Sequence, residues 1–275
     1  MVNLPRFYSN SASSTYEQCP LRWKYKYIDK YPDPPGLAAV IGTFTHSVLE
    51  NLCKEPPTQR TVEQAKTISK NVWATTIRSK DFCSLDLDEN ARRNFKWKAW
   101  NAIEGLWLLE DPTMVDVETT EKRVTANLSG VPFIGYIDRL DRNVDGLVVT
   151  DYKTGRLPRL EDRTKAFGQV VLYAAAVEET LGERPTRSRL LYLGSEILEI
   201  DISESLLNEE KSRLAESWSR LNKDCNNGDF KPNTGPLCGW CSFVTKCDAG
   251  TKEVKLRVNK GRMREDAPAR KLLGI

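Results

Sequence analysis

Two neighbouring stretches of the sequence decide the fold. The first, Val131–Asp141, reads VPFIGYIDRLD, and the second, Gly146–Tyr152, reads GLVVTDY and is followed by Lys153. Both are rich in β-branched and aromatic residues, which favour strands. Asp145-Gly146 lies where a tight turn between neighbouring strands belongs. We therefore expect two adjacent strands, each with an aspartate near its end.

The segments around these strands predict a mixed sheet flanked by helices. Another strand is expected over Asp116–Leu128, joined through Ser129-Gly130, and a fourth over Arg189–Ile200. Capping residues and apolar periodicity predict helices over Tyr8–Ile28, Thr43–Cys53, Thr61–Ser79, Asp88–Leu109, Leu160–Leu181 and Ser203–Asn226. Helices, three strands, a helix and a strand, in that order, are typical of an α/β fold.

Composition divides the chain into four parts, which we expect to form one integrated domain. They are a helical N-terminal part (1–112), the sheet-bearing core (113–202), a helix with a cysteine-rich segment (203–250), and a basic tail (251–275). With 275 residues, 40% of them hydrophobic, the chain can bury a sizeable core. The tail carries a surplus of Lys and Arg. It fits either a phosphate-binding segment or a solvated, disordered end.

Composition also disfavours several classes of protein. No stretch is long and apolar enough to cross a membrane. The start, Met1 to Tyr16, lacks the apolar run of a secretory signal, so we expect a cytoplasmic protein. Seven cysteines, an odd number, fit poorly with a fully paired disulfide framework and favour metal ligands or buried thiols. His46 is the only histidine, which excludes a histidine-rich zinc site.

The aspartates and the lysine point to metal-assisted chemistry on phosphate. Asp151 and Lys153 are two residues apart, so an extended strand points both side chains to one face. Asp138 lies near the end of the neighbouring strand, and a twisted, splayed pair can bring both carboxylates to one cation. Such oxygens suit Mg²⁺ or Mn²⁺, which assist phosphodiester hydrolysis. An isolated Asp-x-Lys tripeptide, however, is more often a surface ion pair.

Further motifs occur in a recognisable order. The chain carries Cys19-Pro20, Gly42-Thr43-Phe44-Thr45-His46, Gly135-Tyr136-Ile137-Asp138-Arg139, Thr150-Asp151-Tyr152-Lys153-Thr154-Gly155, and then Gln169 and Tyr173. This order resembles the RecB-like nucleases of the PD-(D/E)XK superfamily over about residues 8–250, with 55–110 matched by arrangement only. The resemblance implies a restriction-endonuclease-like α/β core, in which helices flank a mixed sheet.

The resemblance implies a metal site and a catalytic lysine. His46, Asp138 and Asp151 would bind the cation together with the backbone carbonyl of Tyr152. Lys153 would be the catalytic lysine, and the two aspartates would share in catalysis. A capping or packed histidine is the alternative for His46. The lysine-bearing motif of the family often starts with Glu, whereas here it starts with Asp, which is shorter but also binds metal.

Four other residues are placed less firmly by the sequence. Gln169 and Tyr173 lie one helical turn apart, and the resemblance implies that they contact the nucleic-acid backbone near the metal. Ordinary helix packing is the alternative for this pair. Glu118 or Glu121 would add another carboxylate, and the sequence leaves the choice between them open.

Cysteines near the end of the chain form a second pattern. Cys238-Gly239-Trp240-Cys241 is a C-x-x-C, and Cys247 follows after five residues. Closely spaced thiolates of this kind converge on one metal centre, and a fourth ligand must then come from a distant part of the chain. Cys19 is the best candidate, and Cys53 and Cys225 are the alternatives. Spacing alone does not distinguish a Cys₄ zinc site from an iron–sulphur cluster.

The resemblance favours a 4Fe-4S cluster with a structural role. Cys19 with its following proline, and the three cysteines near the end, are similar to the iron–sulphur members of this nuclease family. These include the CRISPR-associated exonuclease and the nuclease half of bacterial helicase–nuclease complexes. Cys53, Cys83 and Cys225 then read as free thiols.

These observations predict a Mg²⁺- or Mn²⁺-dependent DNA exonuclease. We expect it to act on single-stranded DNA ends in recombination, repair or phage-type DNA processing. The sequence contains no G-x-x-x-x-G-K-[ST] phosphate loop, so a helicase or recombination partner would separate strands. The alternatives are a catalytically silent DNA-binding or cluster-carrying subunit of a larger complex, and a nuclease stabilised by zinc.

Overall fold

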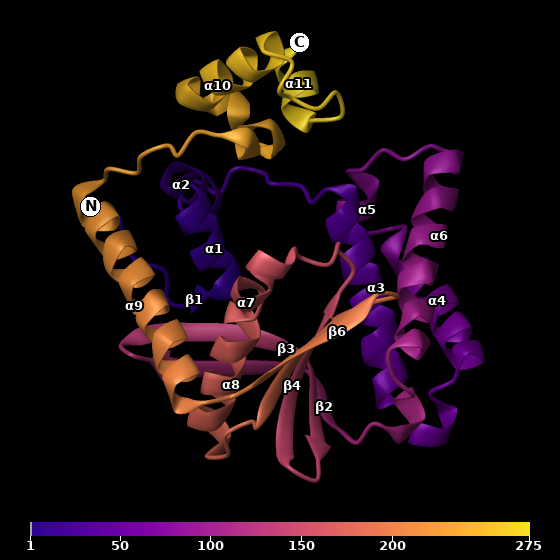
Figure 1. The fold of residues 1–275 in the computed structure, drawn as a ribbon. Coiled ribbons are helices and arrows are strands. Elements are labelled where there is room, and N and C mark those ends of the chain that lie inside the picture. Colours follow the sequence, from indigo (N-terminus) through magenta and orange to yellow (C-terminus); the bar gives the residue numbers. More distant parts are fainter. Residues whose placement is uncertain (1) are drawn as a thin grey trace. The chain divides into compact units, whose positions relative to one another are not determined.

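The structure is a computed structural model that describes residues 2–275, and Figure 1 traces its helices and strands. The chain forms two compact units. One combines the residues up to Pro34 with Arg213–Ile275, and the other is continuous over Pro35–Ser212. The two ends of the chain therefore belong to the same unit, and the four parts suggested by composition stay a prediction.

The Pro35–Ser212 unit contains a mixed sheet. Its strands are β2 (Val117–Leu128), β3 (Val131–Asn143), β4 (Gly146–Lys153), β5 (Arg187–Tyr192) and β6 (Glu196–Asp201). Each strand pairs with the next in sequence, antiparallel throughout except for the parallel pair of β4 and β5. A parallel step needs a crossover connection, and helix α8 (Gly168–Leu181) lies in it. The predicted α/β sheet is therefore confirmed.

Helices pack on both faces of this sheet. Along β4 and β5, alternate residues point to opposite faces. Tyr152 and its paired neighbour Leu191 point into an apolar core shared with the preceding helices. On the other face, Ser188 donates a hydrogen bond to the carbonyl of Val170 in α8 at 3.3 Å. The helices of the apolar core are α3 (Leu37–Lys54), α4 (Val62–Thr76), α5 (Lys80–Cys83) and α6 (Glu89–Glu104).

Close backbone contact explains two differences from the sequence-based elements. The strand expected over Arg189–Ile200 is split into β5 and β6, because Gly194 turns the chain with a φ of 75°. The helix expected over Asp88–Leu109 ends at Glu104 and continues as η2 (Gly105–Leu108). Gly105 and Gly194 touch through their backbones, and a Cβ on Gly105 would lie 2.4 Å from the nitrogen of Gly194. No larger residue fits at Gly105 without a shift.

The segment before α8 is also less regular than expected. The predicted helix over Leu160–Leu181 is broken into η4 (Leu160–Asp162), α7 (Arg163–Ala166) and α8. Only α8 buries a continuous set of apolar side chains, from Val170 to Val177. Tertiary packing therefore stabilises α8 over its length, whereas the preceding turns are short. The remaining turns of this unit are η1 (Pro57–Gln59) and η3 (Pro112–Met114).

The other unit is mostly helical and is built around Trp23. This side chain is fully buried, and its ring stacks on Tyr27 and Phe230 with centroids 5.4 and 6.0 Å away. The hydroxyl of Tyr16 donates to Asp224 at 2.6 Å, which joins the first helix to a late one. The elements are β1 (Tyr8–Ser9), α1 (Asn10–Gln18), α2 (Pro20–Tyr27), the end of α9 (Glu204–Asn227), η5 (Pro236–Trp240), η6 (Val244–Lys246), α10 (Asp248–Asn259) and α11 (Pro268–Leu273).

The basic tail is folded. Residues 251–275 contain most of α10 and all of α11, where a solvated, disordered end was one of the two expectations. Val254 and Ala269 are buried against Val244, so the tail contributes apolar side chains to its own unit. Between residues 2 and 275, none of the helices has both the length and the apolar composition to cross a membrane.

Candidate active site

The register of β3 and β4 brings Asp138 and Asp151 together. The ladder pairs Arg139 with Thr150, and one further step in this register puts Asp138 opposite Asp151. Beyond the last backbone pair, the side chain of Asp138 bonds to β4: its Oδ2 accepts a hydrogen bond from the backbone N–H of Tyr152 at 2.8 Å. The two carboxylates that the sequence placed at separate strand ends therefore lie in one site.

Asp151 is a buried carboxylate that lies beside a second carboxylate. Burial and the nearby charge of Asp138 raise its pKa to about 6, although Lys153 opposes the shift. The Nζ of Lys153 lies 2.7 Å from Asp151 Oδ2. This ammonium is therefore the partner of that oxygen. The Asp-x-Lys pair is thus an ion pair, but its carboxylate is buried beside a second carboxylate, a setting that suits a divalent cation.

His46, Glu121 and Asp138 form a second part of the same site. The Nδ1 of His46, in α3, lies 3.3 Å from Asp138 Oδ1. One ligand atom from each of the three residues lies within 4.8 Å of the others. Burial lowers the pKa of His46, but the hydrogen bond and charge of Asp138 outweigh it, and a backbone hydrogen bond with Tyr152 raises the pKa further. His46 therefore contacts two of its expected co-ligands.

The structure distinguishes between the two glutamates that the sequence left open. Glu121 lies between Thr120 and Lys122, which pair with Arg139 and Ile137, so it faces Asp138 across β2 and β3. Its φ is 46°, a left-handed conformation that is uncommon for residues other than glycine and clusters at functional sites. Glu118 instead forms an ion pair with Arg142 at 3.0 Å. Glu121 is the carboxylate that joins the site.

A chain of hydrogen bonds holds Lys153 from the side of α8. Its Nζ donates to Gln169 Oε1 at 3.2 Å, and Gln169 Nε2 donates to the hydroxyl of Tyr173 at 2.8 Å. Tyr173 is buried, and its ring fills the space beside Gly135, where a Cβ would come within 2.4 Å of it. Contact of Gln169 and Tyr173 with nucleic acid stays a prediction, and burial leaves Tyr173 little surface for it.

The sequence matches a family model along most of its length. The model of the PD-(D/E)XK nuclease superfamily covers residues 8–248, which include every residue of the site described above. The chain belongs to the PD-(D/E)XK nuclease superfamily. The assignment of Asp138 and the Asp151-Tyr152-Lys153 tripeptide to the motif of that name stays a prediction.

A solved structure is similar to this PD-(D/E)XK nuclease over most of both chains. It is a crystal structure of a "putative exonuclease" from Eubacterium rectale, with a TM-score of 0.55 and 15% sequence identity. The match covers 90% of this chain and 88% of the other. At this identity the likeness concerns the fold. Among curated proteins, none matches the sequence closely enough to count as a relative.

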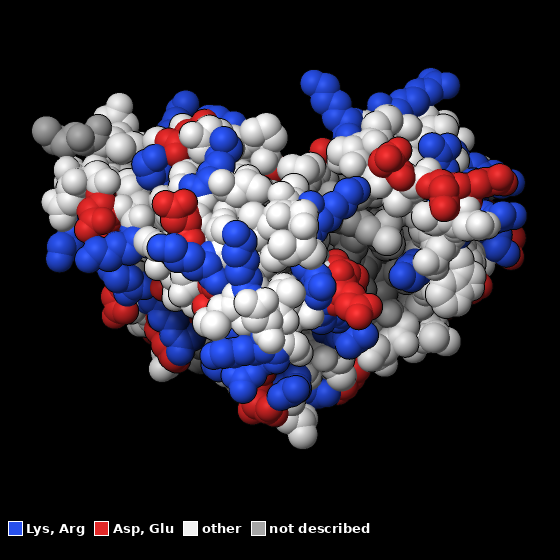
Figure 2. Space-filling model, turned by 90° about the horizontal axis from the view of Figure 1, so that it is seen from above, with Lys and Arg blue, Asp and Glu red and all other residues white. Residues whose placement is uncertain are grey.

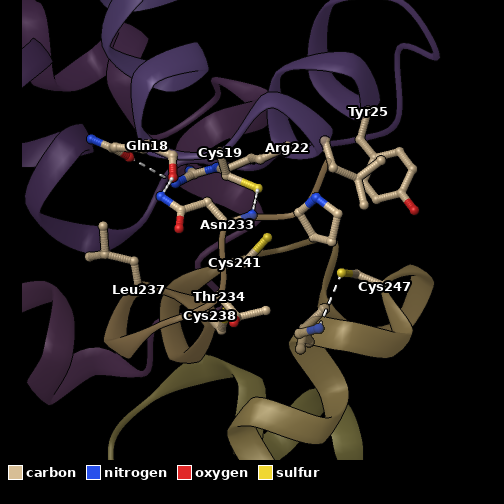
Figure 3. Close-up of a pocket in the computed structure, with 14 residues that line it drawn as sticks. Gln18, Cys19, Arg22, Tyr25, Asn233, Thr234, Leu237, Cys238, Cys241 and Cys247 are labelled. Atoms are coloured by element: carbon tan, nitrogen blue, oxygen red, sulfur yellow. Dashed lines mark hydrogen bonds between the residues drawn. The ribbon is translucent and has the colours of Figure 1, made fainter. Parts of the chain in front are cut away.

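The nuclease carries its cysteine pattern in the unit that contains both ends of the chain. Figure 3 shows Cys19, Cys238, Cys241 and Cys247 around one cavity, as the sequence pattern predicts. Cys19 lies between α1 and α2, and Cys247 precedes α10. The other cysteines do not line this cavity: Cys53 and Cys225 are buried elsewhere and Cys83 is exposed.

Backbone N–H groups point at three of these sulphurs. The N–H of Asn233 donates to Cys19 Sγ at 3.3 Å, and that of Gly250 donates to Cys247 Sγ at 3.2 Å (Figure 3). The N–H of Gly235 approaches Cys238 Sγ at 3.5 Å. Such bonds favour the thiolate, the form that binds metal. Burial opposes this by raising the pKa of Cys238 and Cys241.

The raised pKa of Asp151 predicts how the stability of the metal-free nuclease depends on pH. The pKa in the folded protein, about 6, lies above the ordinary value of 3.8. The folded state therefore keeps a proton that the unfolded state releases in this window. This contribution to the free energy of unfolding is complete below about pH 4 and is lost as pH rises through about 6. One pKa unit corresponds to about 1.4 kcal/mol, so the loss is on the order of 2–3 kcal/mol.

Urea denaturation in EDTA at pH 4 and pH 7 checks this expectation. The wild type should lose part of its free energy of unfolding between pH 4 and pH 7. Asp151→Asn has no carboxyl group to titrate at this position, so it should not show this loss and should be more stable relative to the wild type at pH 7 than at pH 4. Asp145→Asn, at an exposed position beyond the end of β3, is the matched control and should track the wild type. Equal pH dependence of Asp151→Asn and wild-type protein would contradict the electrostatics described for this site.

Proposed function

We propose that this PD-(D/E)XK nuclease is a RecB-like, Mg²⁺- or Mn²⁺-dependent deoxyribonuclease. The observation that carries the proposal is the convergence of Asp138, Asp151 and Lys153 at one point of the sheet. His46 and Glu121 add a nitrogen and a carboxylate there. Carboxylate oxygens with an imidazole suit Mn²⁺ or Mg²⁺. Burial and the neighbouring charge of Asp138 disfavour the ionised form of Asp151, and a bound cation would stabilise both carboxylates.

Each residue of the site has a part in this mechanism. His46, Asp138 and Asp151 would hold the cation with the carbonyl of Tyr152, and Glu121 is placed to add a ligand. A bound divalent cation supplies the Lewis acidity that phosphodiester hydrolysis needs. The ammonium of Lys153, held beside Asp151, offsets negative charge that develops on the phosphate oxygens.

The substrate we propose is the end of a single-stranded DNA, cleaved exonucleolytically. Support comes from the resemblance to RecB-like nucleases, and the fold likeness to the "putative exonuclease" of Eubacterium rectale agrees with it. On the face in Figure 2, cationic and acidic side chains are interspersed, and the net charge is only +3. Affinity for a polyanion would then depend on local groups at the site more than on total charge.

The setting we propose is DNA recombination, repair or phage-type processing in the cytoplasm. The sequence contains no phosphate loop, so strand separation would come from a helicase or recombination partner. A catalytically silent subunit is the competing interpretation. It is disfavoured by the intact lysine, which has no role in carrying a cluster and is held in the site by Gln169.

End-labelled DNA tests the activity. With Mg²⁺ or Mn²⁺, the wild type should shorten single-stranded DNA from an end over a time course, and EDTA should stop it. Lys153→Met should lower the rate at least about a hundredfold, the usual effect of removing one electrostatic group from an active site. Lys165→Met, at an exposed lysine of α7, is the control and should cleave normally. Wild-type rates in Lys153→Met would contradict the proposal, and internal cleavage would replace exonuclease by endonuclease.

The two glutamates of β2 make a matched pair for the metal site. Glu121→Gln removes a charge from the group with His46 and Asp138, so its activity should need about tenfold more Mn²⁺ and recover when Mn²⁺ is raised. Glu118→Gln loses only the ion pair with Arg142 and should show the wild-type Mn²⁺ dependence. Mn²⁺ titrations of the initial cleavage rate decide the matter. Identical curves for the two variants would show that Glu121 lies outside the metal site.

We also propose that Cys19, Cys238, Cys241 and Cys247 hold a 4Fe-4S cluster with a structural role. Their sulphurs surround one cavity, and three accept backbone N–H bonds, as the sulphur ligands of such clusters do. The cluster would join α1 and α2 to α10 within their unit. Binding of the cluster and folding of this unit would then be coupled.

Anaerobic purification tests the cluster. The protein should be brown, absorb broadly near about 400 nm, and contain about four iron atoms per chain. Cys19→Ser should lose colour and iron because it removes one ligand. Cys83→Ser, at an exposed cysteine, is the control and should keep both. A colourless wild type with one zinc ion would contradict the cluster but leave the nuclease site standing, and a brown Cys19→Ser protein with full iron would show a different fourth ligand.

A further inference from the structure

A buried ionic network lies on the face of β3 and β4 opposite to Asp151 and Lys153. Its centre is Arg139, whose side chain is 0% exposed. The guanidinium donates to both carboxylate oxygens of Glu110, from Nη1 to Oε1 at 2.6 Å and from Nη2 to Oε2 at 3.1 Å. Its Nε lies 2.7 Å from Asp141 Oδ1 as an ion pair. Glu110 precedes the sheet in sequence, so the network joins this segment to β3.

The same network crosses from β3 to β4 and β5. Arg139 Nη1 also donates to the hydroxyl of Tyr152 at 2.9 Å. Thr150 Oγ1 donates to Asp141 Oδ2 at 2.7 Å. Arg189, in β5, reaches Glu110 Oε2 at 3.2 Å. These side-chain bonds therefore fasten together the strands whose backbone ladder already sets the active site.

Stability alone does not account for this network. Charges removed from water lose hydration free energy, and a buried ion pair often contributes no more than apolar residues of the same size. Apolar packing is available nearby, since Tyr152 borders the apolar core shared with Leu191. Compared with apolar packing, the network adds geometric specificity. Bidentate, charge-assisted hydrogen bonds hold the bonded atoms in one arrangement.

Two residues of this network are neighbours in sequence of the proposed metal ligands. Arg139 directly follows Asp138, and Tyr152 directly follows Asp151. Because strand residues alternate between faces, fixing Arg139 and Tyr152 on one face fixes the two carboxylates on the other. Tyr152 takes part on both faces: its side chain belongs to the network, and its backbone N–H bonds to Asp138. A shift of the Tyr152 side chain would move the Asp138 contact and the carbonyl together.

We propose that Arg139 is a positioning residue that, with Glu110 and the Tyr152 hydroxyl, sets the geometry in which Asp138 and Asp151 bind the divalent cation. The inference rests on the proposed function for the existence of that cation site. It assigns no contact with DNA or cation to Arg139. Its consequence is that damage to the network weakens metal binding out of proportion to any loss of stability.

Mn²⁺ binding by calorimetry, without DNA and well below the melting temperature, tests this. Tyr152→Phe removes only a hydroxyl, which bonds to Arg139 and also contacts Cys53 Sγ at 3.5 Å. Glu110→Gln removes only a charge, so both variants should fold. Each should bind Mn²⁺ about tenfold more weakly, the lower end of effects seen when residues supporting metal ligands are changed. Leu191→Ala is the matched control: it is buried, pairs with Tyr152 and touches the same apolar core. It should lower the melting temperature yet keep the wild-type affinity.

A double variant sharpens the test, and two outcomes would overturn the inference. Tyr152→Phe and Glu110→Gln both act on Arg139, although Glu110 also binds Arg189, so together they should weaken binding by less than the product of their separate effects. Wild-type affinity in both single variants would overturn the proposal. So would an equal loss in Leu191→Ala, because the effect would then be general destabilisation. A wild-type chain that binds no Mn²⁺ would overturn the proposed metal site itself, and the positioning role with it.

Discussion

Repulsion between Asp138 and Asp151 is the constraint around which the active site is built. The register of β3 and β4 places the two carboxylates at the same level, and burial denies Asp151 the water that would screen them. Lys153 and His46 offset part of this charge. Burial first, and the charge of Asp138 second, still raise the pKa of Asp151 to about 6. A divalent cation would stabilise the ionised form of both carboxylates.

The residues on both faces of β3 and β4 support this charged pair. On the α8 side, Gln169 holds Lys153, and Gly135 leaves room for the tyrosine behind it. On the other side, Arg139 is enclosed by carboxylates and the Tyr152 hydroxyl. Because successive strand residues point to opposite faces, Asp138 and Asp151 face the proposed cation site. The residues that follow them, Arg139 and Tyr152, hold the backbone in place from the other face. A site that must hold its ligands within fractions of an ångström benefits from both.

Local sequence signals predicted much of this arrangement. Strand composition, turn residues and the two-residue spacing of Asp151 and Lys153 act over short distances, and they correctly placed β2 to β4. The choice of Glu121 over Glu118 was not predictable, because it depends on a left-handed backbone facing Asp138 across the β2–β3 register. The split of β5 from β6 follows from the left-handed turn at Gly194, and the contact of this turn with Gly105, far away in sequence, was not predictable. The partners of Arg139 were also not predictable from the sequence, because Glu110 lies outside the strands.

A crystal structure of the wild-type nuclease soaked with Mn²⁺, with anomalous scattering used to locate the ion, tests the central claim most directly. The account predicts an anomalous peak bonded to His46 Nδ1, Asp138 and Asp151, with the carbonyl of Tyr152 and Glu121 at its edge. Lys153 should be displaced little by the ion. A Mn²⁺ ion bound away from the two aspartates, or no ion at a concentration that supports cleavage, would contradict the account.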